Sequence, residues 1–220
     1  MTPRIKVCCI ADIEEAKIAI ECGASALGLV GKMPSGPGVI SDEEIRKIAA
    51  AVPPPIGTFL LTSETSTRKI IEHHQRTQTN TVQIVDELVD GIYADLRKNL
   101  PAIKLVQVIH IKDERSIDDA LRVAKYADAL LLDSGNPDLK IKELGGTGRV
   151  HDWKLSRQIV EQSPIPVFLA GGLTPENVQE AITQIQPFGL DVCRGVRTNG
   201  KLDRKKLESF FKSCTSTHNS

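Results

Sequence analysis

Short apolar runs alternate with amphipathic segments along the whole chain. The apolar runs, in which β-branched residues are frequent, cover residues 5–10, 24–31, 56–61, 81–86, 104–111, 127–133, 165–172 and 188–196. The segments with helical periodicity that follow them cover residues 12–23, 41–52, 65–76, 91–99, 116–127, 152–162, 174–185 and 203–213. The pattern therefore predicts a chain built from repeated strand-then-helix units.

The number of these units predicts the fold. Strands that are continuously apolar and separated by helices are typical of a parallel sheet that is buried on both faces. Eight units in about 210 residues are the repeat number of a (β/α)8 barrel, or TIM barrel. The alternative is an open, doubly wound sheet, but its usual GxGxxG after the first strand is absent. We expect an α/β protein with one domain, a (β/α)8 barrel over residues 1–213, followed by a polar tail over 214–220.

The overall charge limits the kinds of partner. Lys plus Arg and Asp plus Glu both number 28, so the formal net charge is zero. Binding to nucleic acid or to a membrane surface would require a clustered excess of positive charge. We therefore expect neither as a partner, and any bound anion must be held by backbone amides or by a few placed cations.

The cysteines and the N-terminal residues indicate a cytoplasmic protein. The first residues show no signal-peptide pattern, and no segment approaches the roughly 18 apolar residues of a membrane span. The five cysteines, an odd number, are therefore expected to be reduced thiols. There is no CxxC and no nearby Cys/His cluster, so we predict no metal at Cys8 and Cys9. A disulfide between these two neighbours would strain the backbone.

The adjacent cysteines Cys8 and Cys9 stand near the carboxyl end of the first predicted strand, the end at which (β/α)8 barrels carry their chemistry. Side chains alternate along a strand, so if Cys8 points into the barrel mouth, Cys9 points at the surrounding helices. The alternative is that both are small buried hydrophobic residues, as most free cysteines are.

Asp133 ends the sixth predicted strand, in "ALLLDSG". Burial at the barrel rim would raise the pKa of its carboxyl group, which a general acid needs near neutral pH. The alternative is an aspartate that caps a turn. The segment that follows, "SGNPDLKIKELGGTGRVH", shows little helical or strand pattern, and such long loops in compact domains are usually functional or disordered. This loop favours the functional interpretation of Asp133.

Three glycine-rich elements follow the last three predicted strands. They are Gly145, Gly146, Thr147 and Gly148 before the helix near 152, Gly171 and Gly172 after the seventh strand, and Arg194 and Gly195 at the end of the eighth. Glycine-rich turns that lead into helices offer N–H groups to anions, and the loops after strands seven and eight form the usual phosphate pocket of this fold. One such element would mean little, because turns need glycine anyway. Together they predict a site for a small phosphorylated metabolite.

Five segments, spread from the first strand to the last, match the motifs of one enzyme family. They are "IKVCCIA", "LLLDS", "GGTGRVHDW", "FLAGGLTPENV" and "GLDVCRGV". In these segments the chain resembles phosphoribosylanthranilate isomerase, a (β/α)8 enzyme of tryptophan biosynthesis. The resemblance implies an Amadori rearrangement of N-(5-phosphoribosyl)anthranilate to its 1-deoxyribulose 5-phosphate derivative. This is an aldose–ketose isomerisation, an intramolecular oxidoreduction, and it uses no metal or cofactor.

The resemblance also implies roles for two residues. In the family, the strand-six aspartate protonates the ring oxygen of the sugar to give a Schiff base. The strand-one cysteine then takes the proton from C2. These roles fall on Asp133 as general acid and on Cys8 as general base, whereas Cys9 stands where the family has glycine.

The chain departs from the family pattern around the aromatic half of the substrate. The loop after the second strand, "MPSGPGVIS", lacks the arginine that holds the anthranilate carboxylate in the family. After the fourth strand the family has the sequence Q-L-H-G. Residues 83–86 of this chain read Q-I-V-D at that place, so the histidine of the family is missing. In "DVCRGVR", Arg194 replaces a serine and Arg197 a glutamate. Arg194 could supply the missing cation, could bind phosphate, or could be an exposed rim residue.

These observations predict a phosphoribosylanthranilate isomerase that works as a monomer or homodimer on a small phosphorylated sugar. Two alternatives stay open. One is an isomerase that has diverged toward a phosphosugar lacking the anthranilate carboxylate, and the other is a non-catalytic paralogue that binds a phosphate ligand. A metal-dependent epimerase of the same fold is disfavoured because, of the five histidines, only His110 lies near a predicted strand end.

Overall fold

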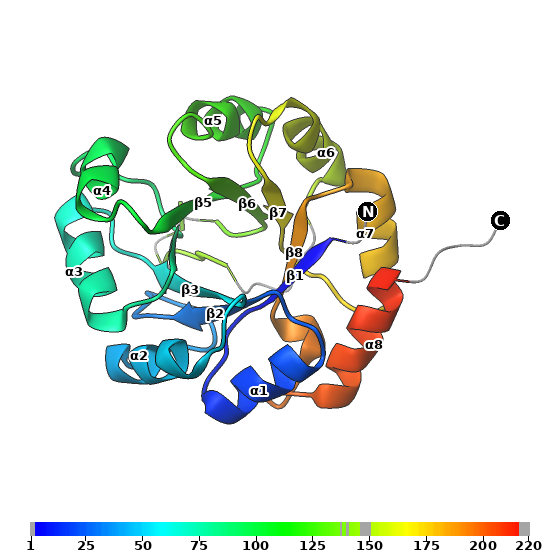
Figure 1. Cartoon of the computed structure of the whole chain (residues 1–220). Helices are drawn as coiled ribbons and strands as arrows, with labels where there is room; N and C mark the ends of the chain where they lie inside the picture. The colour runs from blue at the N-terminus through cyan, green and yellow to red at the C-terminus, as the bar shows by residue number, and fades with distance from the viewer. Residues whose placement is uncertain (1–2, 137, 140, 146–150, 216–220) are drawn as a thin grey trace.

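Eight parallel strands close into a barrel that is surrounded by helices (Figure 1). The computed structural model describes residues 3–136, 138–139, 141–145 and 151–215. The strands are β1 (Arg4–Val7), β2 (Ala26–Val30), β3 (Gly57–Thr62), β4 (Thr81–Ile84), β5 (Lys104–His110), β6 (Ala129–Asp133), β7 (Val167–Leu169) and β8 (Gly189–Val192). They pair in sequence order, and β1 closes on β8 with Arg4 opposite Gly189 and Val7 opposite Val192. The predicted (β/α)8 barrel is confirmed.

A helix follows each strand on the outside of the barrel (Figure 1). The helices are α1 (Ile13–Glu21), α2 (Asp42–Ala51), α3 (Thr67–Thr77), α4 (Tyr93–Asn99), α5 (Arg115–Val123), α6 (Trp153–Gln162), α7 (Val178–Ile185) and α8 (Arg204–Thr215). Between β8 and α8 the chain forms the 3-10 helix η1 (Arg194–Val196) and a small hairpin of β9 (Arg197–Thr198) and β10 (Lys201–Leu202).

Alternation along the strands produces two apolar layers, as β6 illustrates. Ala129 and Leu131 belong to the apolar cluster inside the barrel. Leu130 and Leu132 belong to the larger cluster between the barrel and the helices. Because both faces of the strand are covered by apolar side chains, the strand sequences are continuously apolar.

The C-terminal boundary lies slightly later than the predicted one. Helix α8 continues to Thr215, and Cys214 is buried against the outer cluster. Residues 214 and 215 therefore belong to the last helix and not to a tail, while residues 216–220 lie outside the described part of the chain. The apolar contacts of Cys214 with the outer cluster explain the difference, because they stabilise the helix over these two residues.

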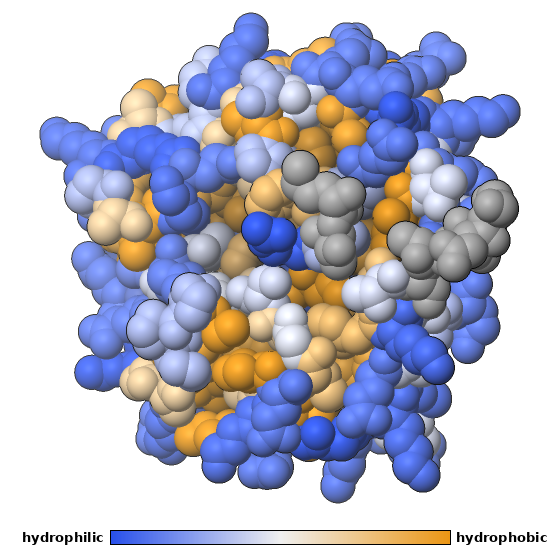
Figure 2. Space-filling model, turned by 45° about the vertical axis from the view of Figure 1, so that its right-hand side comes forward, coloured by the Kyte–Doolittle hydropathy of each residue, from blue (hydrophilic) through white to orange (hydrophobic). Residues whose placement is uncertain are grey.

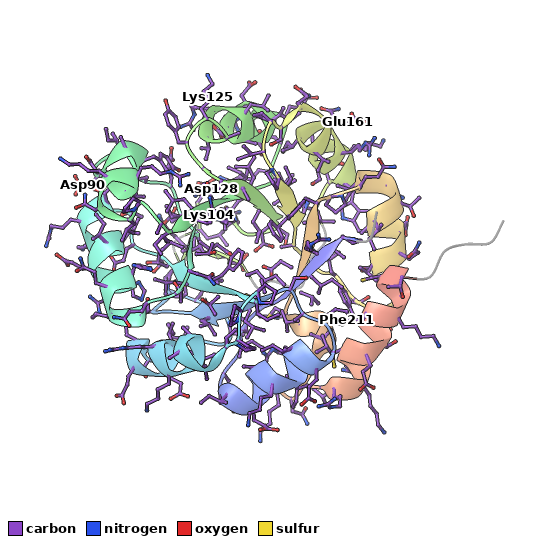
Figure 3. All side chains as sticks on the ribbon, in the orientation of Figure 1. Asp90, Lys104, Lys125, Asp128, Glu161 and Phe211 are labelled. Atoms are coloured by element: carbon purple, nitrogen blue, oxygen red, sulfur yellow. The ribbon has the colours of Figure 1, made fainter. Side chains whose placement is uncertain are left out.

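Charged residues fix the loops at the amino ends of the strands. Asp128, just before β6, pairs with Arg97 at 2.7 Å and with Lys104 at 3.5 Å. Figure 3 shows Lys104 and Asp128 close together where β5 and β6 begin. Asp128 also accepts a hydrogen bond from the backbone N–H of Leu105 at 2.8 Å. In this fold such contacts at the amino ends serve stability, whereas chemistry lies at the opposite ends.

The surface mixes polar and apolar areas. On the face shown in Figure 2, hydrophilic residues predominate at the edges and hydrophobic residues gather between them. None of the helices in the described ranges combines the length and the apolar character that crossing a membrane would require.

Candidate active site

A cavity of about 420 Å³ lies at the carboxyl ends of the strands. The predicted site residues that line it are Cys8, Asp133, Gly145, Gly171, Gly172, Arg194 and Gly195. The barrel thus brings together residues that are separated by almost the whole length of the chain. Gly146, Thr147 and Gly148 were also predicted to bind phosphate, and they lie outside the described residues.

Cys8 follows the last residue of β1 and is 5% exposed. Its backbone N–H donates to the carbonyl of Val192 at 2.8 Å, which continues the β1–β8 pairing by one residue. A Cβ atom on Gly28 of β2 would lie 2.7 Å from the Cys8 Sγ and 3.0 Å from the Lys6 Nζ. The Cys8 thiol therefore points inside the barrel, into space that Gly28 leaves open.

Asp133 is the last residue of β6 and is 7% exposed. Burial raises the pKa of its carboxyl group above the ordinary value, although the backbone N–H of Ser134, which donates to Oδ1 at 2.7 Å, acts in the opposite direction. Gly145 approaches from the long loop with a φ of 135°, and a Cβ there would lie 2.6 Å from Oδ2. Glycine at this position therefore permits both the backbone conformation and the close approach.

The predicted orientation of Cys9 is wrong. Cys9 lines the cavity and belongs to the apolar cluster inside the barrel, whereas Ile10 packs in the outer layer. The reason is local backbone geometry. Strand β1 ends at Val7, and Cys9 has a φ of 64°, so the alternation of an extended strand no longer applies.

A buried ion pair of two residues that were not among the predicted site residues lies inside the barrel beside Cys8. The Lys6 Nζ, which is fully buried, lies 2.8 Å from Oδ1 of Asp191. Burial alone would lower the pKa of Lys6, but the Asp191 carboxylate and the nearby thiols raise it above the ordinary value. A lysine in the middle of the apolar run "IKVCCI", opposed by an aspartate in "FGLDV", is the pattern that could have indicated this pair.

Gln83 adds a polar group to the cavity wall. Its side chain is 2% exposed, and its Oε1 has no hydrogen-bond partner in the described part of the chain. A buried amide oxygen without a partner costs stability unless a ligand or water satisfies it. Gln83 is therefore a group that a substrate hydroxyl or amine can reach.

The loops after β7 and β8 form a glycine-lined wall of the cavity. Gly171 and Gly172 have φ values of 82° and 62°, and Asn177 holds their loop by donating from Nδ2 to the Gly172 carbonyl at 2.9 Å. Among the described residues, no hydrogen bond uses the backbone N–H of Gly171, Gly172 or Gly195 as donor. These N–H groups can therefore serve an anion.

The two arginines near β8 have different environments. Arg194 is exposed at the cavity rim and forms no ion pair with any residue that the structure describes. Arg197 is 8% exposed and pairs with Glu15 at 3.0 Å. From Nη2 it also donates to the carbonyls of Cys8 at 3.2 Å and Cys9 at 2.5 Å. Arg197 therefore braces the loop that carries the cysteines, while Arg194 remains available to a ligand.

Residues 142–145 of the long loop after β6 lie at the cavity, where Leu144 and Gly145 line it. Lys142 forms an ion pair with Asp86, which follows β4, and its carbonyl accepts a hydrogen bond from Ser35 Oγ at 2.6 Å. Three strand-end loops are thereby tied together above the site. In residues 3–136, 138–139, 141–145 and 151–215, no three His, Cys, Asp or Glu side chains are grouped as they would be around a metal ion.

The fold and the site together define a (β/α)8 barrel whose cavity combines a buried carboxyl group, a thiol and unused backbone N–H groups at the carboxyl ends of the strands. The chain belongs to the N-(5'phosphoribosyl)anthranilate (PRA) isomerase family, whose model matches residues 5–213.

Individual relatives agree with this assignment. The chain is 37% identical over 209 residues to N-(5'-phosphoribosyl)anthranilate isomerase 2 of Methanosarcina mazei, and the match covers 94% of this chain and 92% of that protein. The crystal structure of phosphoribosyl anthranilate isomerase from Thermotoga maritima is similar with a TM-score of 0.80 and 30% identity, covering 96% of this chain and 98% of that one. A second crystal structure, of the isomerase in complex with reduced 1-(o-carboxyphenylamino)-1-deoxyribulose 5-phosphate, is similar with a TM-score of 0.77 and 28% identity, with the same coverage.

Proposed function

We propose that this chain isomerises N-(5-phosphoribosyl)anthranilate to its 1-deoxyribulose 5-phosphate derivative, an intramolecular oxidoreduction of tryptophan biosynthesis. The observation that carries the proposal is that Cys8 of the first strand and Asp133 of the sixth line one cavity in a chain of this family. Asp133 is the general acid and Cys8 the general base.

Asp133 supports the first half of the reaction. Because burial raises the pKa of its carboxyl group, the group retains its proton nearer to neutral pH than an exposed aspartate does. It donates this proton to the ring oxygen, so that the sugar ring opens to a Schiff base. The carboxyl group lines the cavity, and Gly145 leaves beside it the space that a side chain would fill.

Cys8 supports the second half of the reaction. Its Sγ takes the proton from C2 of the Schiff base to give an enolamine, which becomes the aminoketose. The hydrogen bond to Val192 and the contacts of Arg197 with the Cys8 and Cys9 carbonyls hold the thiol in position. Fixed placement of the base matters because proton transfer requires hydrogen-bond distance to the substrate.

Other groups that line the cavity bind the two anionic groups of the substrate. The backbone N–H groups of Gly171, Gly172 and Gly195 bind the phosphate, together with Gly145 and the predicted residues Gly146, Thr147 and Gly148. Arg194 supplies a positive charge at the rim, either to the phosphate or to the anthranilate carboxylate. The reaction needs no cofactor, and the enzyme is expected to act in the cytoplasm as a monomer or homodimer.

The test is turnover of freshly generated phosphoribosylanthranilate by the purified protein, followed by the loss of anthranilate-type fluorescence. The Cys8→Ser and Asp133→Asn variants are measured beside the wild type, with circular dichroism to show that they are folded. Each variant should lose at least about a hundredfold in turnover, the usual magnitude for general acid–base groups. Near-normal turnover in either folded variant would contradict the role of that residue.

A second candidate function is isomerisation of a phosphosugar that lacks the anthranilate carboxylate. The observation that favours it is the cavity wall after β2, where Met33, Ser35, Gly36 and Pro37 provide no positive charge. In that case the wild type would show no turnover of phosphoribosylanthranilate but would still bind ribose 5-phosphate. Absence of both activities would instead favour a non-catalytic protein with another phosphate ligand.

A further inference from the structure

We propose that Cys9 and Cys193 form an oxidative modification site, a dithiol at the mouth of the barrel that closes to a reversible disulfide and blocks the enzyme. The two Sγ atoms lie 2.7 Å apart, although the residues are 184 positions apart in the sequence. Both side chains line the candidate active-site cavity, so the disulfide would form beside Cys8.

The backbone already holds the two cysteines in position. Val7, two residues before Cys9, is paired with Val192, the residue directly before Cys193, where β1 lies beside β8. Arg197 fixes the Cys9 carbonyl from the β8 side at 2.5 Å. A disulfide requires an S–S distance of about 2.05 Å. The two sulfur atoms therefore have to approach each other by less than about 1 Å to form the bond.

A small oxidant can reach this pair. The cavity is open to solvent, and Cys9 also lines a neighbouring cavity of about 340 Å³ together with Arg194 and Arg197. The hydrogen bond with Cys9 and the charge of Arg197 lower the pKa of the Cys193 thiol, while burial opposes this change. Cys193 is also less buried than Cys9, so we expect Cys193 to react first and Cys9 to close the bond.

The chemistry balances with a peroxide as oxidant. The Cys193 thiolate attacks one oxygen of hydrogen peroxide, the O–O bond breaks, and a sulfenic acid forms as the other oxygen leaves and is protonated to water. The Cys9 sulfur then attacks the Cys193 sulfur, the S–O bond breaks, and a second water leaves. Two thiols are oxidised to one disulfide while one peroxide is reduced to two waters.

The disulfide would affect the positions of both Cys8 and Arg194 in the candidate active site. It ties the residue next to Cys8 to the residue next to Arg194, and it draws the loop after β1 toward the loop after β8. Cys8 itself keeps its thiol, so reduction restores the original enzyme. We expect at least a tenfold loss of phosphoribosylanthranilate turnover in the disulfide form.

The experiment treats the purified protein with hydrogen peroxide and maps the cross-linked peptides by mass spectrometry before and after dithiothreitol. Trypsin leaves Cys8 and Cys9 in one peptide, so the Cys8→Ser variant is mapped in parallel to show which cysteine is joined to Cys193. Cys9→Gly and Cys193→Ser remove one partner each. Cys22→Ser serves as the control, because Cys22 lies at the end of α1, away from the pair.

We expect a peptide joined through Cys9 and Cys193 in the wild type and in Cys8→Ser. It should be absent from Cys9→Gly and from Cys193→Ser. We also expect the turnover lost on oxidation to return with dithiothreitol in the wild type and in Cys22→Ser. Absence of the cross-link, or full turnover in protein that is completely cross-linked, would overturn the proposal. The peptide map does not depend on the proposed activity, so failure of the isomerase assay alone would leave the disulfide testable.

Discussion

The ammonium group of Lys6 lies 2.8 Å from the carboxylate of Asp191 inside the barrel, where the two residues face each other on paired strands. Lys6 is fully buried, and its Nζ also lies 5.4 Å from the centre of the Phe59 ring. The pair joins β1 to β8 close to Cys8, at the point where the barrel closes. Because the pair is buried and lies beside the candidate active site, its loss should affect both the stability of the barrel and the position of Cys8.

Removing one partner of this pair should be costly. Lys6→Met leaves the Asp191 carboxylate buried without its cation, and such losses typically cost about 3 to 5 kcal/mol. The free energy of unfolding, measured in urea, should fall by this amount. The double variant Lys6→Met/Asp191→Asn should lose less than the sum of the two single variants, because no charge remains unpaired. Strictly additive losses would mean that the two groups do not interact.

The pH dependence of turnover should reflect Asp133. Because burial raises the pKa of its carboxyl group, Asp133 keeps its proton to a higher pH than an ordinary aspartate and loses it as the pH rises through that pKa. If Asp133 is the acid, kcat/KM falls on the alkaline side with an apparent pKa above that of an ordinary aspartate. The profile is measured by fluorescence in buffers of constant ionic strength. A flat profile across the acidic and neutral range would contradict this assignment.

Arg194 should act in binding more than in chemistry. It is exposed at the cavity rim, so Arg194→Ala should raise KM by about 10-fold or more, in line with loss of one charge-assisted contact, and change kcat less. Arg46→Ala, an exposed arginine on α2, is the matched control and should change neither constant. A larger effect on kcat than on KM would place Arg194 in transition-state chemistry instead.

Replacement of Cys9 by glycine should leave the protein folded and active. The Cys9 φ of 64° is unfavourable for a residue with a side chain, so Cys9→Gly relieves strain while it loses the burial of one thiol. The net change in the free energy of unfolding should stay within about 2 kcal/mol, and turnover should persist. Cys9→Val is the contrasting variant, because a β-branched residue is disfavoured at positive φ and would crowd Gly38. If the Cys9→Gly protein is folded but inactive, the general base is Cys9 and not Cys8.

The Glu15–Arg197 pair should contribute to stability at neutral pH and lose this contribution in acid. Burial opposes ionisation of Glu15, but hydrogen bonds from Arg197 and from backbone N–H groups hold the pKa of Glu15 below its usual value. Because the folded-state pKa is lowered, the stabilisation is complete above the unfolded value of about 4.3 and disappears as the pH falls through the folded value.

Glu15→Gln should therefore lower the free energy of unfolding by about 3 kcal/mol at pH 7, as expected when a largely buried pair is broken. The difference from wild type should vanish in acid. Glu14→Gln, at an exposed neighbour, should have little effect at any pH. A constant difference between Glu15→Gln and wild type down to pH 3 would show that packing, and not charge, is responsible.

Local patterns in the sequence were sufficient for the barrel and for the position of several candidate residues at its rim. Apolar runs and helical periodicity depend on neighbours in the chain, so they place the strands and helices, and the fold then places every strand end at the same rim. Cys8 and Asp133 could be placed at this rim because Cys8 directly follows β1 and Asp133 ends β6. The glycine turns could be found because they follow strands seven and eight.

Contacts between distant residues could not be found in this way. The buried pair of Lys6 and Asp191 depends on the closure of the barrel, which brings the first strand beside the last. The inward turn of Cys9 depends on one positive φ angle after the end of β1, and the proximity of its sulfur to Cys193 depends on the same closure. The sequence by itself determined the elements and their order, because these follow from local periodicity. Only the tertiary structure decided which side chains meet, because that depends on contacts across more than 180 residues of chain.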